Sequence, residues 1–133
     1  MRLVGTENAQ LDDKRRLAVP AKFRKELGTG DLYVTASMEE RCLNIYAEST
    51  FTATEDEVKR ETRMTAEGRA AWRKVFAFTE LVQPDAQGRV VIPARLLARV
   101  GIAAPADLVC AGMNEWLEVW ERKRYETDVE GND

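Results

Sequence analysis

Short apolar patches separated by polar turns run along most of this chain. Two of them, residues 17–19 and 90–92, are too short for a helix and rich enough in β-branched side chains to predict strands. Each patch is followed by a proline and, eight positions later, by a glycine, a pattern that typically opens and closes a short helix. Within each predicted helix two apolar residues stand at positions i and i+4, which predicts one buried stripe. The residues are Pro20, Phe23, Leu27 and Gly28 in the first case and Pro93, Leu96, Val100 and Gly101 in the second.

The two regions are copies of one unit, because residues 10–28 and 83–101 match at a constant offset of 73 positions. The matched pairs are Gln10/Gln83, Asp12/Asp85, Arg16/Arg89, Pro20/Pro93, Ala21/Ala94 and Gly28/Gly101. Two further strands are predicted after each helix, at residues 32–35 and 43–46 in the first copy and at 108–110 and 117–120 in the second. A unit of about 45 residues can hardly bury its own core, so the copies are expected to wrap into one β-barrel with a pseudo-two-fold axis.

Two helices are expected between the copies. Thr54 and Glu57 suit a capping box that opens the first helix, and the second is expected from about Thr65. Aromatic residues on one face of the second helix are either core, the commoner case, or a surface for a partner. The prediction is an α+β chain with a first β-β-α-β-β repeat at residues 5–52, a helical connector at 53–80 and a second repeat at 81–124.

Composition excludes several classes of protein. The 133 residues are 44% hydrophobic and 32% charged, which is typical of a soluble globular chain, and no apolar run is long enough for a membrane span or a signal peptide. There is no histidine, so the commonest general base and metal ligand are missing. Cys42 and Cys110 do not form a zinc-binding pattern and are expected to be buried, reduced thiols in a cytoplasmic protein. No metal and no cofactor are expected.

The charge is distributed unevenly. The chain as a whole carries −3, but residues 12–25 carry +4 and residues 85–99 carry +2, which leaves −9 on the remainder. Basic segments on an acidic body create a local positive potential, and local potential governs binding more than the total charge does. The two basic segments therefore favour a polyanion such as DNA as the partner.

Each basic segment contains an Asp-x-x-x-Arg motif at the turn before a predicted strand, Asp12…Arg16 and Asp85…Arg89. An aspartate at a turn can accept backbone N–H groups and also hold the arginine, which then loses less entropy on meeting a phosphate or a guanine. The alternative is that each pair is only a fold-holding ion pair. The repetition favours DNA binding. The predicted DNA-contacting residues are Arg16, Arg89, Lys14, Arg15, Lys22 and Arg24, with Asp12 and Asp85 as supports.

Catalysis is not expected. Two symmetry-related aspartates are found in proteases whose carboxyl groups share a proton, but here an arginine four residues after each aspartate favours ionisation of both. The chain has no histidine for a nucleophilic triad and no glycine-rich phosphate loop. We therefore predict no catalytic residue and no small-molecule substrate.

Residues 11–20, 41–43, 85–89 and 117–121 resemble the corresponding segments of the MraZ family, bacterial regulators built from two tandem SpoVT/AbrB-type repeats. The resemblance covers the chain from Gly5 to about Tyr125. It implies a sequence-specific DNA-binding regulator of the division and cell-wall gene cluster, located in the cytoplasm on the nucleoid. It also implies a ring-like homo-oligomer that binds repeated promoter elements in double-stranded DNA through Arg16 and Arg89, supported by Asp12 and Asp85.

The alternative function is a protein-interaction module of the same superfamily, such as an antitoxin. Antitoxins usually carry one repeat and a disordered tail, whereas this chain has two repeats and a short acidic end at residues 127–133. Two residues depart from the family pattern: Leu3 stands where the family tends to have phenylalanine, a mild change in packing, and Arg15 stands where the family has glycine and where the second copy has Gly88. If this turn needs a positive φ, Arg15 is expected to be strained.

Overall fold

The computed structural model describes residues 1–62 and 65–131. These residues form eight strands and five helices. In chain order they are β1 (Thr6–Leu11), β2 (Arg16–Ala18), α1 (Ala21–Leu27), β3 (Leu32–Ala36), β4 (Leu43–Ala47), α2 (Glu48–Thr62), α3 (Ala66–Phe76), β5 (Thr79–Val82), β6 (Arg89–Val91), α4 (Ala94–Val100), β7 (Ala106–Gly112), β8 (Leu117–Glu121) and α5 (Arg122–Asp128).

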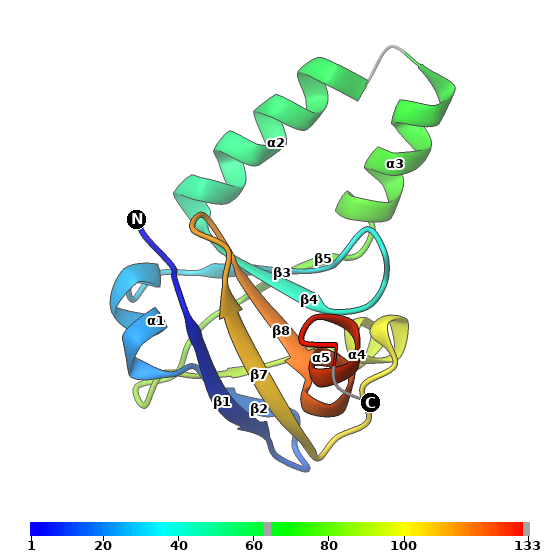
Figure 1. The fold of residues 1–133 in the computed structure, drawn as a ribbon. Helices are drawn as coiled ribbons and strands as arrows, with labels where there is room; N and C mark the ends of the chain where they lie inside the picture. The colour runs from blue at the N-terminus through cyan, green and yellow to red at the C-terminus, as the bar shows by residue number, and fades with distance from the viewer. Residues whose placement is uncertain (63–64, 132–133) are drawn as a thin grey trace.

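All strands belong to one antiparallel sheet in the order β5-β3-β4-β8-β7-β1-β2-β6, which curls into a nearly closed barrel (Figure 1). The two repeats contribute their strands to it in alternating pairs, in agreement with the predicted shared barrel. The opening lies between β5 and β6. In the first repeat Leu11 pairs with Leu17 and joins β1 to β2. The equivalent of Leu11 in the second repeat is Pro84, which has no N–H to donate, and β5 ends before it at Val82.

The strand register has the predicted two-fold symmetry. In the β2–β6 pair, Leu17 faces its own counterpart Val90. In the β4–β8 pair, Asn44 faces its counterpart Glu118. The pseudo-two-fold axis therefore passes through the centres of these two strand pairs. Each repeat completes its pairing only with the other, because β1 pairs with β7 and β3 pairs with β5.

Alternating side chains of the strands fill the barrel, and the short helices close it. Leu43, Ile45 and Leu117 are fully buried. Phe23 and Leu27 of α1 and Leu96 and Val100 of α4 are buried as their spacing predicted. Pro20 and Pro93 directly precede the two helices rather than forming their first residues. Cys42 and Cys110 are buried free thiols, and burial raises the pKa of each to about 12.

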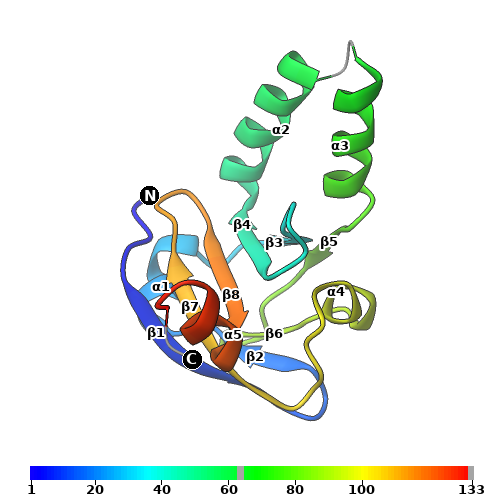
Figure 2. The same cartoon turned by 45° about the vertical axis from the view of Figure 1, so that its right-hand side comes forward.

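The helices α2 and α3 form a hairpin that projects from the barrel (Figure 2). The second begins after Thr65, whose hydroxyl accepts a hydrogen bond from the Gly68 N–H at 2.9 Å, as predicted. The predicted capping box at Thr54 is wrong, because α2 already begins at Glu48. Thr54 lies inside the helix and its hydroxyl donates to the Thr50 carbonyl at 3.0 Å.

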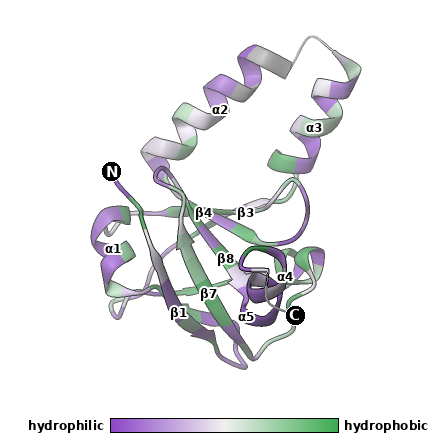
Figure 3. Cartoon of the chain, in the orientation of Figure 1, coloured by the Kyte–Doolittle hydropathy of each residue, from purple (hydrophilic) through white to green (hydrophobic). Residues whose placement is uncertain are grey.

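One element was not predicted from the sequence, the short helix α5 directly after β8. The Glu121 side chain caps it by accepting the Arg124 N–H at 3.2 Å. Its residues are largely hydrophilic and are coloured purple in Figure 3, whereas β7 is mostly green. The helix lacks an apolar stripe, which is why the hydrophobic pattern did not indicate it. Within the described residues, no helix is long and apolar enough to cross a membrane.

Candidate nucleic-acid interface

The first Asp-x-x-x-Arg turn is organised around the carboxylate of Asp12. Its Oδ1 accepts the backbone N–H groups of Lys14 at 2.9 Å and Arg16 at 2.8 Å. Its Oδ2 accepts the Arg16 Nε at 2.6 Å. Aspartates favour such turns because a short side chain can satisfy the backbone donors that follow it. The arginine is thus held through Nε, and its terminal nitrogens have no partner in the described part of the chain.

The second turn repeats this geometry. Asp85 Oδ1 accepts the N–H groups of Gln87 at 2.8 Å and Arg89 at 2.9 Å, and its Oδ2 accepts the Arg89 Nε at 2.9 Å. Backbone bonds from Asp12 to Arg16 and from Asp85 to Arg89 close the two turns alike. Both ion pairs are partly exposed, so each has a modest effect on folding and serves mainly to hold the direction of the arginine.

Both aspartates are stabilised as anions. The pKa of Asp12 lies below its usual value of 3.8, chiefly because the Arg16 N–H donates to the carboxylate. The pKa of Asp85 is lowered in the same way by the Arg89 N–H. Hydrogen bonds to the charged form favour ionisation. Neither carboxyl group is poised to take or give a proton near neutral pH.

The paired strands β2 and β6 bring the two turns together. Arg16 faces Val91 and Arg89 faces Ala18 across the pair. The arginines are therefore diagonal neighbours on the outer face, which puts their Cα atoms roughly 7–8 Å apart. Both line an open groove of about 790 Å³, which Asp13 and Asp107 also line. The groove presents two oriented guanidinium groups beside the pseudo-two-fold axis.

Arg15 adopts the left-handed backbone that the family's glycine suggested, with φ of 63° against 77° for Gly88. The strained conformation is accompanied by two contacts with the opposite repeat. Its Nη1 donates to the Ile92 carbonyl at 3.0 Å, and the Ile92 N–H donates to the Arg15 carbonyl at 2.8 Å. The local sequence does not indicate this contact of the Arg15 side chain, because its partner lies 77 positions away.

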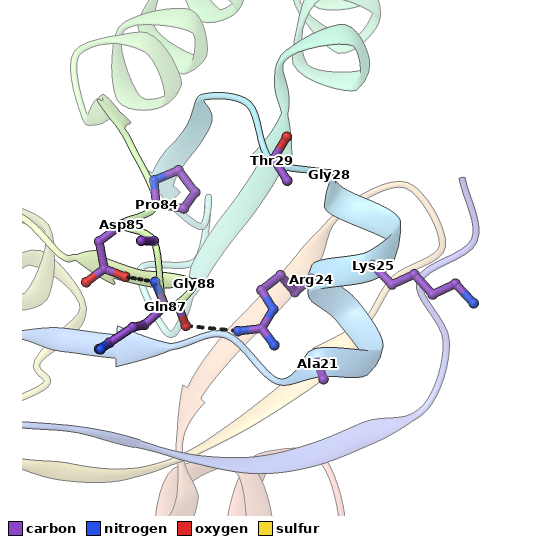
Figure 4. Close-up of a pocket in the computed structure, with 10 residues that line it drawn as sticks. Ala21, Arg24, Lys25, Gly28, Thr29, Pro84, Asp85, Gln87 and Gly88 are labelled. Carbon is purple, nitrogen blue, oxygen red and sulfur yellow. Dashed lines mark hydrogen bonds between the residues drawn. The ribbon is translucent and has the colours of Figure 1, made fainter.

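Arg24 belongs to α1 of the first repeat but lies against the second turn (Figure 4). Its Nη1 donates to the Gln87 carbonyl at 3.0 Å. Its side chain covers Gly88, where an added Cβ would overlap it. Arg24, Lys25, Thr29 and Gln87 are among the residues that line a pocket of about 620 Å³ between the helix and the turn. Arg24 thus joins the two repeats at the site.

The remaining two predicted residues lie in different places. Lys14 is exposed on the first turn, beside Arg16 in the chain. Lys22 lies away from the turns, since its Nζ approaches Gly5, at the opposite end of β1 from Asp12. The same Nζ lies 5.5 Å from the centre of the Phe23 ring. The structure therefore places the candidates Lys14, Arg15, Arg16, Arg24 and Arg89 on or against the two turns and leaves Lys22 apart.

Known proteins match this chain over most of its length. The family model described as "MraZ protein, putative antitoxin-like" matches residues 3–74 and again residues 75–131, in agreement with tandem repeats. Relatives that match this chain carry the name transcriptional regulator MraZ. The relative from Salinispora tropica is 38% identical over 93% of this chain and 84% of its own length. The relative from Frankia alni is 36% identical over 98% and 88%, and that from Spiroplasma kunkelii is 32% identical over 98% and 89%. These names describe regulators of transcription and not enzymes.

Proposed function

Because this chain belongs to the MraZ family of transcriptional regulators, we propose that it regulates transcription by binding double-stranded DNA sequence-specifically through its two Asp-x-x-x-Arg turns. Arg16 and Arg89 would enter one major groove, which is about 12 Å wide and accommodates two side chains separated by roughly 7–8 Å. Asp12 and Asp85 would support them. Lys14 and Arg15 would add contacts to phosphates.

One observation carries the proposal. The two arginines are diagonal neighbours on β2 and β6, and an aspartate holds each of them through Nε. The terminal nitrogens of both arginines have no partner among the described residues. A guanidinium fixed in this way keeps the donor pair that recognises the O6 and N7 acceptors of guanine. An ion pair that only stabilises the fold does not need to lie on the outer face at two equivalent turns.

The finer parts of the proposal follow from the family. We propose that the DNA target is the repeated promoter element upstream of the division and cell-wall gene cluster. Several subunits would bind these repeats as a ring-like homo-oligomer on the nucleoid in the cytoplasm. A linked array raises affinity through effective concentration by about 10²–10⁴, which compensates for the few basic residues of each subunit.

The alternative is a protein-interaction role, as in antitoxins, with which the description of the family model compares MraZ. A protein of that kind would use its surface to bind a partner protein rather than a specific DNA. Binding to DNA from upstream of its own gene separates the two functions.

The test is an electrophoretic mobility shift assay of the full chain on that upstream DNA. Arg16→Ala and Arg89→Ala should each abolish specific binding, since a bidentate base contact is worth roughly 1–3 kcal/mol per subunit and the loss is multiplied over all engaged subunits. Arg41→Ala is a control, because Arg41 also pairs with an aspartate, Asp128, through Nε at 2.9 Å and through Nη2 at 2.5 Å, but belongs to neither turn.

Circular dichroism and gel filtration should show that the fold and the oligomeric state of the arginine variants are unchanged. Unfolded or dissociated variants would mean that these arginines are structural. Equal binding of wild type to the upstream DNA and to a scrambled duplex would refute sequence-specific recognition.

A further inference from the structure

The two turns of the site have the same backbone but different chemistry. The first reads Asp-Asp-Lys-Arg-Arg and carries a net charge of +1, whereas the second reads Asp-Ala-Gln-Gly-Arg and is neutral. Gln87 therefore occupies the position of Lys14, and Gly88 the position of Arg15. A lysine at such a site gains affinity from any phosphate, but a neutral amide gains little from counterion release. The second turn must contribute to binding by another route.

The main chain of Gln87 is held at both of its polar atoms. Its N–H donates to Asp85 Oδ1 at 2.8 Å, and its carbonyl accepts from Arg24 Nη1 at 3.0 Å. The side-chain amide is exposed and has no hydrogen-bond partner among the described residues. Figure 4 shows it directed away from α1, while the carbonyl points toward Arg24. The fixed main chain sets the point from which the side chain extends, and the amide keeps both its donor and its acceptor for a ligand.

The contact that holds Gln87 has no counterpart in the first turn. The residue of α4 that corresponds to Arg24 is Leu97, a buried apolar side chain without a donor. Gly88 makes the asymmetry possible, because a Cβ there would overlap Arg24. The hydrogen bond from Arg24 to the Gln87 carbonyl is therefore specific to the second turn. It is made to the same residue whose side-chain amide has no partner among the described residues.

We propose that Gln87 reads an adenine in the major groove and that Arg24 is its positioning residue, an inference that rests on the proposed DNA-binding function. A glutamine amide matches the N6 donor and N7 acceptor of adenine, as the arginine fork matches guanine. Gln87 and Arg89 are two residues apart, hence at most about 7 Å. At roughly 3.4 Å per base step, they reach adjacent or next-but-one base pairs. Each subunit then reads an asymmetric site, with adenine specificity supplied by the second turn alone.

The experiment is selection of random-sequence DNA duplexes by the full-length chain, followed by sequencing. Wild type should select a motif with an adenine near a guanine. Gln87→Ala should lose the adenine preference, by roughly 5- to 150-fold at that base pair, while keeping the guanine. Gln87→Lys, which copies Lys14, should replace the adenine preference by guanine or by tolerance of any base. Gln83→Ala is the control, since Gln83 is an exposed glutamine outside the turn.

The positioning role of Arg24 is tested in the same selection. Arg24→Leu, which copies Leu97, should weaken the adenine preference, and Arg24→Lys should preserve it because lysine can still donate to the carbonyl. An Arg24→Leu chain with the full preference overturns the role of Arg24. A Gln87→Ala chain that selects the wild-type motif overturns the inference and leaves the proposed function intact. A wild-type chain that selects no motif overturns both.

Discussion

At the scale of single residues, Arg15 combines two opposing contributions to stability. Its left-handed backbone, with φ of 63°, costs roughly 1–2 kcal/mol for a residue that has a Cβ. The hydrogen bond from its guanidinium to the Ile92 carbonyl stabilises the folded state by a similar free energy. The strain expected from the sequence is present, and the structure adds a contact that offsets it.

Replacing Arg15 separates the two contributions. Arg15→Ala should lower the free energy of unfolding by about 1–3 kcal/mol, because the strain remains and the hydrogen bond is lost. Arg15→Gly should be more stable than Arg15→Ala by about 1 kcal/mol, since glycine adopts a positive φ freely. Urea denaturation of the three chains measures both differences. Equal stabilities of the Gly and Ala variants would show that the backbone conformation at this turn costs nothing.

Asp12 and Asp85 make the free energy of unfolding depend on pH in the acidic range. Since the pKa of Asp12 and of Asp85 is lowered in the folded chain from the ordinary value of 3.8, their contribution to stability is present above that value and is lost as pH falls through the folded pKa. The free energy of unfolding should therefore fall below about pH 4. The double variant Asp12→Asn/Asp85→Asn should show a shallower fall in urea titrations from pH 6 to pH 2.5. An unchanged slope would mean that other carboxylates govern the acid response.

At the scale of elements, Phe51 packs the α2–α3 hairpin against the barrel. The Phe51 ring is buried and stacks on Tyr33 of β3 with centroids 4.4 Å apart. It also meets Tyr46 edge-on, and Phe76 of α3 packs against it at 6.2 Å. Trp72 lies one turn before Phe76 and contacts that ring at 5.5 Å. Trp72 and Phe76 are both half-buried, whereas Phe51 is buried, so the aromatic face of α3 serves only partly as core.

Truncation of Phe51 and of Trp72 should show that the two rings contribute unequally to stability. Phe51→Ala should cost roughly 3 kcal/mol or more, because it leaves a cavity under the hairpin. Hydrogen exchange should show that amide protection falls in α2 and α3 before it falls in the barrel strands. Trp72→Ala should cost less than half as much at the same protein concentration. The assignment of Phe51 as the anchor fails if the two variants are equally destabilised.

At the scale of the whole molecule, binding has to overcome a net charge of −3. The positive groups that the fold gathers at β2, β6 and their turns form a local patch on an acidic body, and Asp13 and Asp107 border the same groove. A single subunit thus offers few phosphate contacts. The proposed oligomer would supply the remaining affinity by multiplying these contacts along repeated DNA.

The affinity for promoter DNA should therefore fall steeply with salt and rise with the number of repeats. Each phosphate contact contributes a slope of about 0.9 in a plot of log K against log salt. Fluorescence anisotropy on duplexes with one, two and four repeats measures both effects. Salt-independent binding, or the same affinity for one repeat and four, would contradict a multivalent electrostatic interaction.

The sequence by itself determined the features that act over a few residues or repeat along the chain. β-branched patches, the prolines and glycines around α1 and α4, and the Asp-to-Arg spacing are local signals. The offset of 73 positions between Asp12 and Asp85 predicted the shared barrel, because neither copy alone can bury a core. The helix α5 and the start of α2 were missed because their residues carry weak hydrophobic periodicity.

Only the tertiary structure decided which side chains meet across the repeats. The pairing of β2 with β6 makes Arg16 and Arg89 neighbours, and closure of the barrel brings Arg24 to Gln87 and Arg15 to Ile92. Those partners are 63 and 77 positions apart, so no local preference specifies them. Conversely, closeness in the chain does not ensure closeness in space. Lys22 is two residues from Arg24, but its Nζ lies against Gly5 and away from the turns. Such contacts depend on how the sheet closes, which is a property of the whole chain rather than of any segment.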